Sequence, residues 1–212
     1  MLIEYNPWAM VIGSDTPTLA VYKDGSVIFV KKESEEKYGL YTTSIDLDGH
    51  FIQSITPENL GDLKESYTLS DWTDQPTNVF VWKEKNVAIY GNMNEVREKL
   101  PKGIWEVYSA IKSFDSSDAK EWLPDYIEVM LWPYEYAPDE STVWPGGWPD
   151  LEHATTKKRS KNSFSLYLPS EHFDELKSLL KTRKQKGALL ISGKKMAVSY
   201  RFPFPHDKLW KQ

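Results

Sequence analysis

A strand–turn–strand pattern occurs three times in this chain and limits what it can fold into. In residues 19–29, Asp24-Gly25 lies between two apolar runs, which is the strongest short-range signal for a β-hairpin. Residues 79–89 align with this segment without gaps, and residues 188–198 are a third, weaker match. Short hairpins resemble one another for physical reasons alone, so the recurrence indicates either an internal repeat or chance convergence.

The segments before the second and third hairpins follow a similar order. Residues 164–168 alternate as a half-buried strand does, Ser170 is the predicted N-cap of a helix, and Gly187 is its predicted stop signal. Before the second hairpin, residues 51–55 are predicted to be extended, and Thr56 is predicted to cap another helix. Both series therefore predict a strand, a helix and a hairpin.

The remaining elements complete the predicted fold. Short helices are expected over residues 94–100 and 102–114, and the nearly continuous apolar run at residues 126–132 is typical of a central strand. Hairpins with few crossover helices predict an α+β fold, with a mainly antiparallel sheet and a few helices packed on one face. We expect one domain over residues 1–212. The recurring order leaves open two pseudo-repeated halves, at about residues 1–125 and 126–212.

The composition indicates a folded protein and excludes thiol chemistry. Hydrophobic residues make up 40% of the chain and charged residues 27%, which is enough apolar material for a core. The chain has no cysteine, so a disulfide, a zinc–thiolate site and a cysteine nucleophile are excluded. Its longest apolar runs are shorter than the roughly 18 residues of a membrane span, and residues 1–10 lack the basic segment of a signal peptide. We therefore expect a soluble, cytoplasmic protein.

Charge is distributed unevenly along the chain. Residues 1–150 hold 12 basic and 26 acidic side chains, a net charge of −14, whereas residues 151–212 hold 14 and 5, a net charge of +9. The two parts either neutralise each other within one folded sheet or face different partners. A coherent acidic face would attract a basic protein and could compete with a nucleic-acid backbone for it.

A loop rich in aromatic residues, proline and glycine is expected over residues 133–156. Exposed aromatic rings beside acidic groups would form a platform for a sugar, a proline-rich peptide or an apolar anchor of a partner protein. The alternative is that the tryptophans fold inward and fix the loop across a sheet face. The candidate partner-binding residues are Trp132, Tyr134, Glu135, Tyr136, Trp144 and Trp148.

The sequence shows no strong catalytic motif. The histidines lack metal-ligand spacing, and both a nucleophile elbow and a phosphate-binding loop are absent from the sequence. Carboxylates close in sequence, such as Glu135 with Asp139 and Glu140, leave a carbohydrate-active hydrolase as an alternative, since that chemistry uses two carboxylates. No catalytic residue, metal or cofactor is predicted.

A basic cluster follows the aromatic loop and consists of Lys157, Lys158, Arg159 and Lys161. Such a cluster can contact phosphates, which makes nucleic-acid binding a further alternative. The interpretation that we favour is a solvated surface whose cations pair with acids from the first part of the chain.

Three segments, residues 144–151 (Trp-Pro-Gly-Gly-Trp-Pro-Asp-Leu), 165–169 and 187–202, resemble uncharacterised bacterial cytosolic proteins of toxin/immunity type. The resemblance covers mainly residues 126–205, and it implies an immunity-type inhibitor that binds a cognate toxin without indicating functional residues. The acidic first part of the chain, the aromatic loop and the lack of a catalytic motif make a non-enzymatic protein-binding module of this type the leading hypothesis. Its expected partner is a toxin or another protein, and its oligomeric state is left open.

Overall fold

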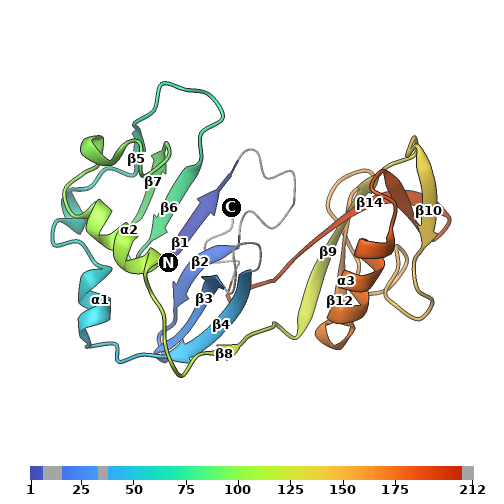
Figure 1. Ribbon diagram of the computed structural model, residues 1–212, viewed down its shortest axis with the longest axis horizontal. Helices are drawn as coiled ribbons and strands as arrows, with labels where there is room; N and C mark the ends of the chain where they lie inside the picture. Colours follow the sequence, from blue (N-terminus) through green and yellow to red (C-terminus); the bar gives the residue numbers. More distant parts are fainter. Residues whose placement is uncertain (7–15, 33–37, 207–212) are drawn as a thin grey trace. The chain divides into compact units, whose positions relative to one another are not determined.

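The computed structural model describes residues 1–6, 16–32 and 38–206, which form two compact units (Figure 1). The described residues up to Trp122 belong to the first unit and those from Leu123 onward to the second. Fourteen strands in two mostly antiparallel sheets and three α-helices make up the described part of the chain, which confirms the α+β class. No described helix combines the length and the apolar character needed to cross a membrane.

The first unit contains an eight-stranded sheet with the strand order β5-β7-β6-β1-β2-β3-β4-β8. All neighbouring strands are antiparallel except β5 and β7, which are parallel. The strands are β1 (Leu2–Tyr5), β2 (Pro17–Val21), β3 (Ser26–Lys32), β4 (Tyr38–Ser44), β5 (Ser66–Thr68), β6 (Thr77–Val81), β7 (Asn86–Tyr90) and β8 (Lys120–Glu121).

The three predicted hairpins are confirmed, and the first and third turns contain residues with positive φ. In the β2–β3 hairpin, Gly25 has a φ of 82°, and its carbonyl oxygen accepts a hydrogen bond of 2.9 Å from the backbone N–H of Ile45. The second hairpin joins β6 to β7. The third turn places Ser192 and Gly193 at φ values of 47° and 75°, as a two-residue hairpin of the twist-compatible type requires.

Helices α1 (His50–Ser54) and α2 (Ile104–Lys112) and the 3₁₀ turns η1 (Leu60–Asp62) and η2 (Arg97–Lys99) complete the first unit. The prediction that residues 51–55 are extended is wrong, because Phe51 and Ile55, one helical turn apart, both pack into the core. The Thr56 hydroxyl donates to the Ile52 carbonyl at 2.9 Å instead of capping a following helix. The series of elements before the second hairpin therefore lacks its expected first strand.

The second unit contains a six-stranded sheet with the strand order β10-β13-β14-β9-β12-β11. Its strands are β9 (Tyr126–Pro133), β10 (Asp139–Val143), β11 (Lys157–Lys158), β12 (Phe164–Pro169), β13 (Gly187–Ile191) and β14 (Lys194–Arg201). Strand β9 lies between β14 and β12, as its apolar sequence predicts for an interior strand. The loop that the sequence predicts over residues 133–156 contains a strand that was not predicted, β10, which pairs in parallel with β13.

Helix α3 (Phe173–Thr182), preceded by the 3₁₀ turn η3 (Ser170–His172), packs against one face of this sheet through Leu176, which is fully buried. Ser170 is not the N-cap of α3, because it begins η3 and its hydroxyl donates to the Pro124 carbonyl. The helix ends at Thr182, so Gly187 is not the stop signal but the first residue of β13.

Candidate partner-binding face

Alternation along β9 gives the second sheet two different faces. Ile127, Val129 and Leu131 are buried in the core beneath α3, and the side chains between them point to the other side of the sheet. We call that other side the distal face. By strand register it includes Glu128, Met130, Trp132, Lys157, Ser165, Tyr167, Leu190, Lys195 and Arg201.

A buried carboxylate lies at the centre of the distal face. Glu128 is only 1% exposed. It accepts hydrogen bonds from Arg201 on β14, from Ser165 on β12 and from Arg159, which follows β11. Arg201 Nε donates to its Oε2 at 2.7 Å, and the Ser165 hydroxyl and Arg159 Nη2 both donate to its Oε1, the former at 2.6 Å. Burial acts to raise the pKa of Glu128, but hydrogen bonds from Arg201 and Ser165 and the charge of Arg201 outweigh it. The pKa consequently lies below its ordinary value, and the group is a carboxylate at neutral pH.

Arg159 is held in place by two partners. Besides its bond to Glu128, its Nε donates to the Ser165 hydroxyl oxygen at 2.8 Å. Ser165 is fully buried, whereas the Arg159 side chain is 47% exposed. One edge of the guanidinium is therefore fixed to the sheet while the rest of the group remains accessible to a ligand.

The charged cluster borders a hollow of about 440 Å³ on the distal face. Its lining combines the predicted candidates Trp132 and Arg159 with Glu128, Met130, Ser165 and Arg201. Apolar and cationic side chains continue beyond the hollow, since Lys157 Nζ lies 4.9 Å from the centroid of the Tyr167 ring and Leu190 is 36% exposed. The distal face can thus offer an apolar surface and fixed guanidinium donors at the same time.

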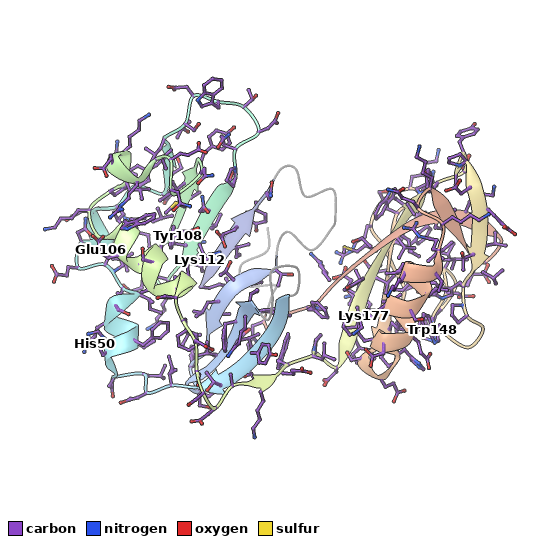
Figure 2. The ribbon with its side chains drawn as sticks, viewed as in Figure 1. His50, Glu106, Tyr108, Lys112, Trp148 and Lys177 are labelled. Atoms are coloured by element: carbon purple, nitrogen blue, oxygen red, sulfur yellow. The ribbon has the colours of Figure 1, made fainter. Side chains whose placement is uncertain are left out.

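The two tryptophans of the Trp-Pro-Gly-Gly-Trp-Pro segment lie elsewhere. Trp144 is 6% exposed, and its indole N–H donates to the Pro149 carbonyl at 3.0 Å. Trp148 packs edge-on against Trp144, with ring centroids 5.0 Å apart, and contacts His172 just before α3. Figure 2 labels Trp148 in the second unit. Trp144 is therefore a core residue and not a surface contact, as the inward-folding alternative expects.

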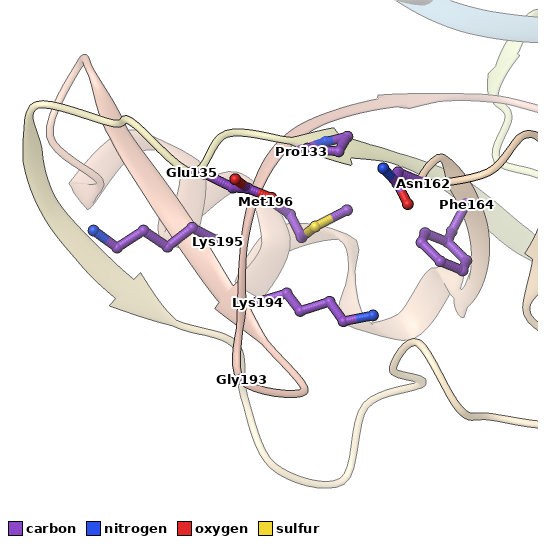
Figure 3. A pocket seen from close by; sticks show the side chains of 8 residues that line it. All are labelled: Pro133, Glu135, Asn162, Phe164, Gly193, Lys194, Lys195 and Met196. Atoms are coloured by element: carbon purple, nitrogen blue, oxygen red, sulfur yellow. The ribbon is translucent and has the colours of Figure 1, made fainter.

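The three other aromatic-loop candidates do not join the distal hollow. The Tyr134 N–H donates to the Lys195 carbonyl at 2.9 Å, and Tyr136 is 93% exposed beyond β9. Glu135 lines a second hollow of about 340 Å³ together with Asn162 and Lys194 (Figure 3).

Among the described residues, each hollow has one carboxylate in its lining. This acid is Glu135 in the second hollow and Glu128 in the distal one. A glycoside hydrolase of the expected kind needs two carboxyl groups, about 5 to 10 Å apart, on either side of the bond that it cleaves. Within the described ranges, no three His, Asp or Glu side chains are grouped so that they could hold a metal ion. Neither hollow shows the pair of carboxylates that such a hydrolase uses.

The predicted basic cluster is divided between two sides of the sheet. Lys157 pairs with Ser165 of the distal face, whereas Lys158 pairs with Phe164, which packs against the core beneath α3. Lys161 is exposed in the turn that follows β11. The four residues therefore do not form one continuous patch, and only Lys157 and Arg159 contribute to the distal face.

The acidic and basic parts of the sequence are interleaved in the second sheet. Glu128 precedes the change of sign and is paired with Arg159 and Arg201, which follow it. Likewise, Lys184 Nζ lies 3.2 Å from the Glu140 carboxylate. The net charges of −14 for residues 1–150 and +9 for residues 151–212 thus partly neutralise each other inside the second unit. They do not define two separate charged faces there.

Sequence reasoning missed Glu128, Met130, Ser165 and Arg201 as members of the site. One signal was present, because Glu128 is the only charged residue within the apolar run at residues 126–132. A carboxylate in an interior strand needs a cationic partner. The identity of that partner depends on strand register, which the sequence pattern alone does not give.

No protein-family model matches this chain, and no curated protein or solved structure is significantly similar to it. The chemistry of the distal face is therefore the basis for a functional argument.

Proposed function

We propose that the protein is a non-enzymatic protein-binding module, an immunity-type inhibitor that binds and neutralises a toxin through the distal face. The observation that carries the proposal is the hollow where Trp132 and Met130 lie beside the fixed guanidinium of Arg159. Tryptophan, tyrosine, methionine and arginine are the residues most enriched at protein interfaces, and tryptophan and arginine supply much of the binding energy there.

The fixed position of Arg159 favours binding. An arginine that is free in solution loses side-chain entropy when a partner immobilises it, at a cost of about 0.5–1.5 kcal/mol. Ser165 and Glu128 already hold Arg159, so much of that cost is met when the protein folds. The accessible part of its guanidinium remains available to hydrogen-bond a carboxylate of the partner.

The charge of the distal face indicates the charge of the partner. Lys157, Arg159, Lys195 and Arg201 are cationic, and Glu128 is the one acid among the residues that define the face. A protein surface with an apolar centre and an acidic rim would be complementary to this arrangement. Association with such a partner should slow as salt concentration rises, because salt screens the attraction between exposed charges.

The resemblance to toxin/immunity proteins supports the same proposal. Two of the segments that carry it, residues 165–169 and 187–202, contain most of β12 and all of β13 and β14. These strands supply Ser165, Leu190 and Arg201 to the distal face. The part of the chain with the resemblance is therefore also the part that builds the proposed contact surface.

The test is calorimetric titration of the full chain with any toxin candidate identified among the genes next to its own, together with protection of cells that express this candidate. Trp132→Ala and Arg159→Ala should each weaken the complex about tenfold or more, since both remove central contacts. Tyr136→Ala removes a highly exposed ring outside the distal hollow and serves as the control, with unchanged affinity. The absence of any complex, or a complex that both distal-face variants form normally, would contradict the proposal.

Single-stranded nucleic acid is a second candidate for the same surface. The observation in its favour is that the aromatic rings of Trp132 and Tyr167 lie among Lys157 and Arg159, and bases stack on such rings while cations contact the backbone. A short oligonucleotide should then bind with an affinity that falls steeply with salt and is reduced by Trp132→Ala. Binding that ignores this substitution would rule out the distal face as the nucleic-acid site.

A further inference from the structure

An exposed tryptophan projects from the first unit. Trp72 is 77% exposed on the loop between β5 and β6, whereas burial is the usual fate of this side chain. A large ring that remains in water forgoes the stabilisation that burial would give. Exposed tryptophans of this kind are common among the residues that anchor a binding partner.

The backbone of this loop is fixed although the ring is exposed. The Tyr90 hydroxyl donates to the Trp72 carbonyl at 2.9 Å and accepts from the Gln75 N–H at 3.2 Å, so one group of β7 holds both ends of a four-residue segment. The Trp72 N–H in turn donates to the hydroxyl of Ser70, a buried residue, at 3.2 Å. Trp72 is thus presented from an ordered position, which lowers the entropy cost of using it as a contact.

The sequence segment around Trp72 is acidic, and the cation Lys99 contacts the backbone just before it, with Nζ 3.2 Å from the Leu69 carbonyl oxygen. Residues 70–76 include Asp71 and Asp74 and no cationic side chain. Both aspartates are exposed, and the Asp71 carboxylate makes no hydrogen bond or ion pair with any residue in the described ranges. A cation beside Trp72 would therefore meet an indole ring, which itself attracts cations, and on the preceding residue a carboxylate without a partner among the described residues.

We propose that Trp72 and Asp71 form a docking site for an arginine-bearing segment of a partner protein. The guanidinium plane of arginine stacks on the indole, its aliphatic stem covers apolar ring surface, and its N–H groups reach the Asp71 carboxylate. This inference goes beyond the proposed function, because the site lies in the other unit and binds the opposite charge.

The experiment uses the full chain labelled with ¹⁵N and a synthetic peptide that alternates arginine with glycine. The indole N–H resonance of Trp72 is identified by its loss in Trp72→Phe. At low ionic strength this resonance should shift saturably with the arginine peptide and not with the matching glutamate peptide. Trp72→Ala should weaken peptide binding about tenfold and Asp71→Asn about threefold, as expected for an indole contact and a single exposed charge pair.

Two further variants make the result specific. Tyr90→Phe removes the hydroxyl that holds the loop and should weaken binding while leaving Trp72 and Asp71 in the chain. Tyr126→Ala is the matched control, because Tyr126 is 52% exposed and also follows an aspartate, Asp125, but lies in the second unit. Equal binding by the wild type and Trp72→Ala would overturn the proposal. It would also be overturned if a neutral oligosaccharide, and not the arginine peptide, shifted the Trp72 resonance.

Discussion

Arg201 and Glu128 form an ion pair in the interior of the second sheet, with Arg201 Nε 2.7 Å from Glu128 Oε2. Their side chains are 13% and 2% exposed, respectively, and they lie directly opposite each other on β14 and β9. This pair and the Arg159 and Ser165 contacts to the other carboxylate oxygen connect three strands to the segment after β11. The cluster is thus both a structural element of the sheet and the support of the proposed contact surface.

Removing the charge of Glu128 should destabilise the protein strongly. Glu128→Gln leaves Arg201 without its buried counter-ion, and breaking a buried pair in this way costs about 3 kcal/mol. Urea unfolding monitored by circular dichroism measures the free-energy difference. Glu135→Gln is the matched control, since Glu135 is exposed, and its effect should stay within about 0.5 kcal/mol. Equal stabilities for the two variants would contradict the role given to Glu128.

The same carboxylate should make stability depend on acid pH. The pKa of Glu128 is lowered in the folded protein from its ordinary value of 4.5, so the unfolded chain binds the proton more readily. The stability that Glu128 contributes is therefore complete above its unfolded pKa of 4.5 and is lost as the pH falls through the lower folded pKa. Urea midpoints are measured from neutral pH to well below pH 4.5. As the pH falls, the midpoint should decrease less steeply for Glu128→Gln than for the wild type. Parallel curves would argue against the lowered pKa.

Gly187 should not tolerate a side chain. A Cβ at this position would lie 2.6 Å from the Glu140 carbonyl oxygen, in the neighbouring strand β10. Gly187→Ala must therefore push β10 and β13 apart, and we expect a loss of about 2 kcal/mol in the free energy of unfolding. Gly146→Ala provides the control, because a Cβ there meets nothing within 4 Å. A Gly187→Ala protein as stable as the wild type would mean that the parallel β10–β13 pairing is incorrect.

The two classes of tryptophan should respond differently to truncation. Trp144→Phe leaves a gap in the core and removes the donor to the Pro149 carbonyl, so it should cost about 2–3 kcal/mol. Trp72→Phe changes an exposed ring and should alter stability by less than about 0.5 kcal/mol. Thermal or urea unfolding of the two variants gives the comparison. The reverse order would contradict the placement of both residues.

Local features of the fold could be predicted, and features that depend on distant partners could not. The hairpin turn at Asp24-Gly25 is specified by residues next to each other in the sequence. By contrast, residues 51–55 have an apolar pattern that suits either a strand or a helix, and packing of Phe51 and Ile55 into the core decides for the helix. The strand β10 pairs with β13 across more than 40 residues of sequence, which no local signal reveals.

The same distinction applies to the candidate sites. Trp132 and Arg159 could be proposed individually as binding residues, but the register of β9, β12 and β11 brings them to one hollow. Alternation within β9 places Trp132 on the distal face, whereas Trp144 enters the core, although both are tryptophans near prolines. Trp72 lies in a short polar loop without a motif, and its exposure and the hydroxyl contacts of Tyr90 become visible only in the folded chain.

The methyl resonance of Met130 reports whether a protein partner binds the distal face. This residue lies on the distal face, whereas Met93 is buried in the first unit and serves as an internal control. The full chain labelled at its methionine methyl groups is titrated with any toxin candidate identified among the genes next to its own. The partner should shift or broaden the Met130 resonance and leave the Met93 resonance unchanged. A stable complex in which the Met130 resonance does not change would contradict it.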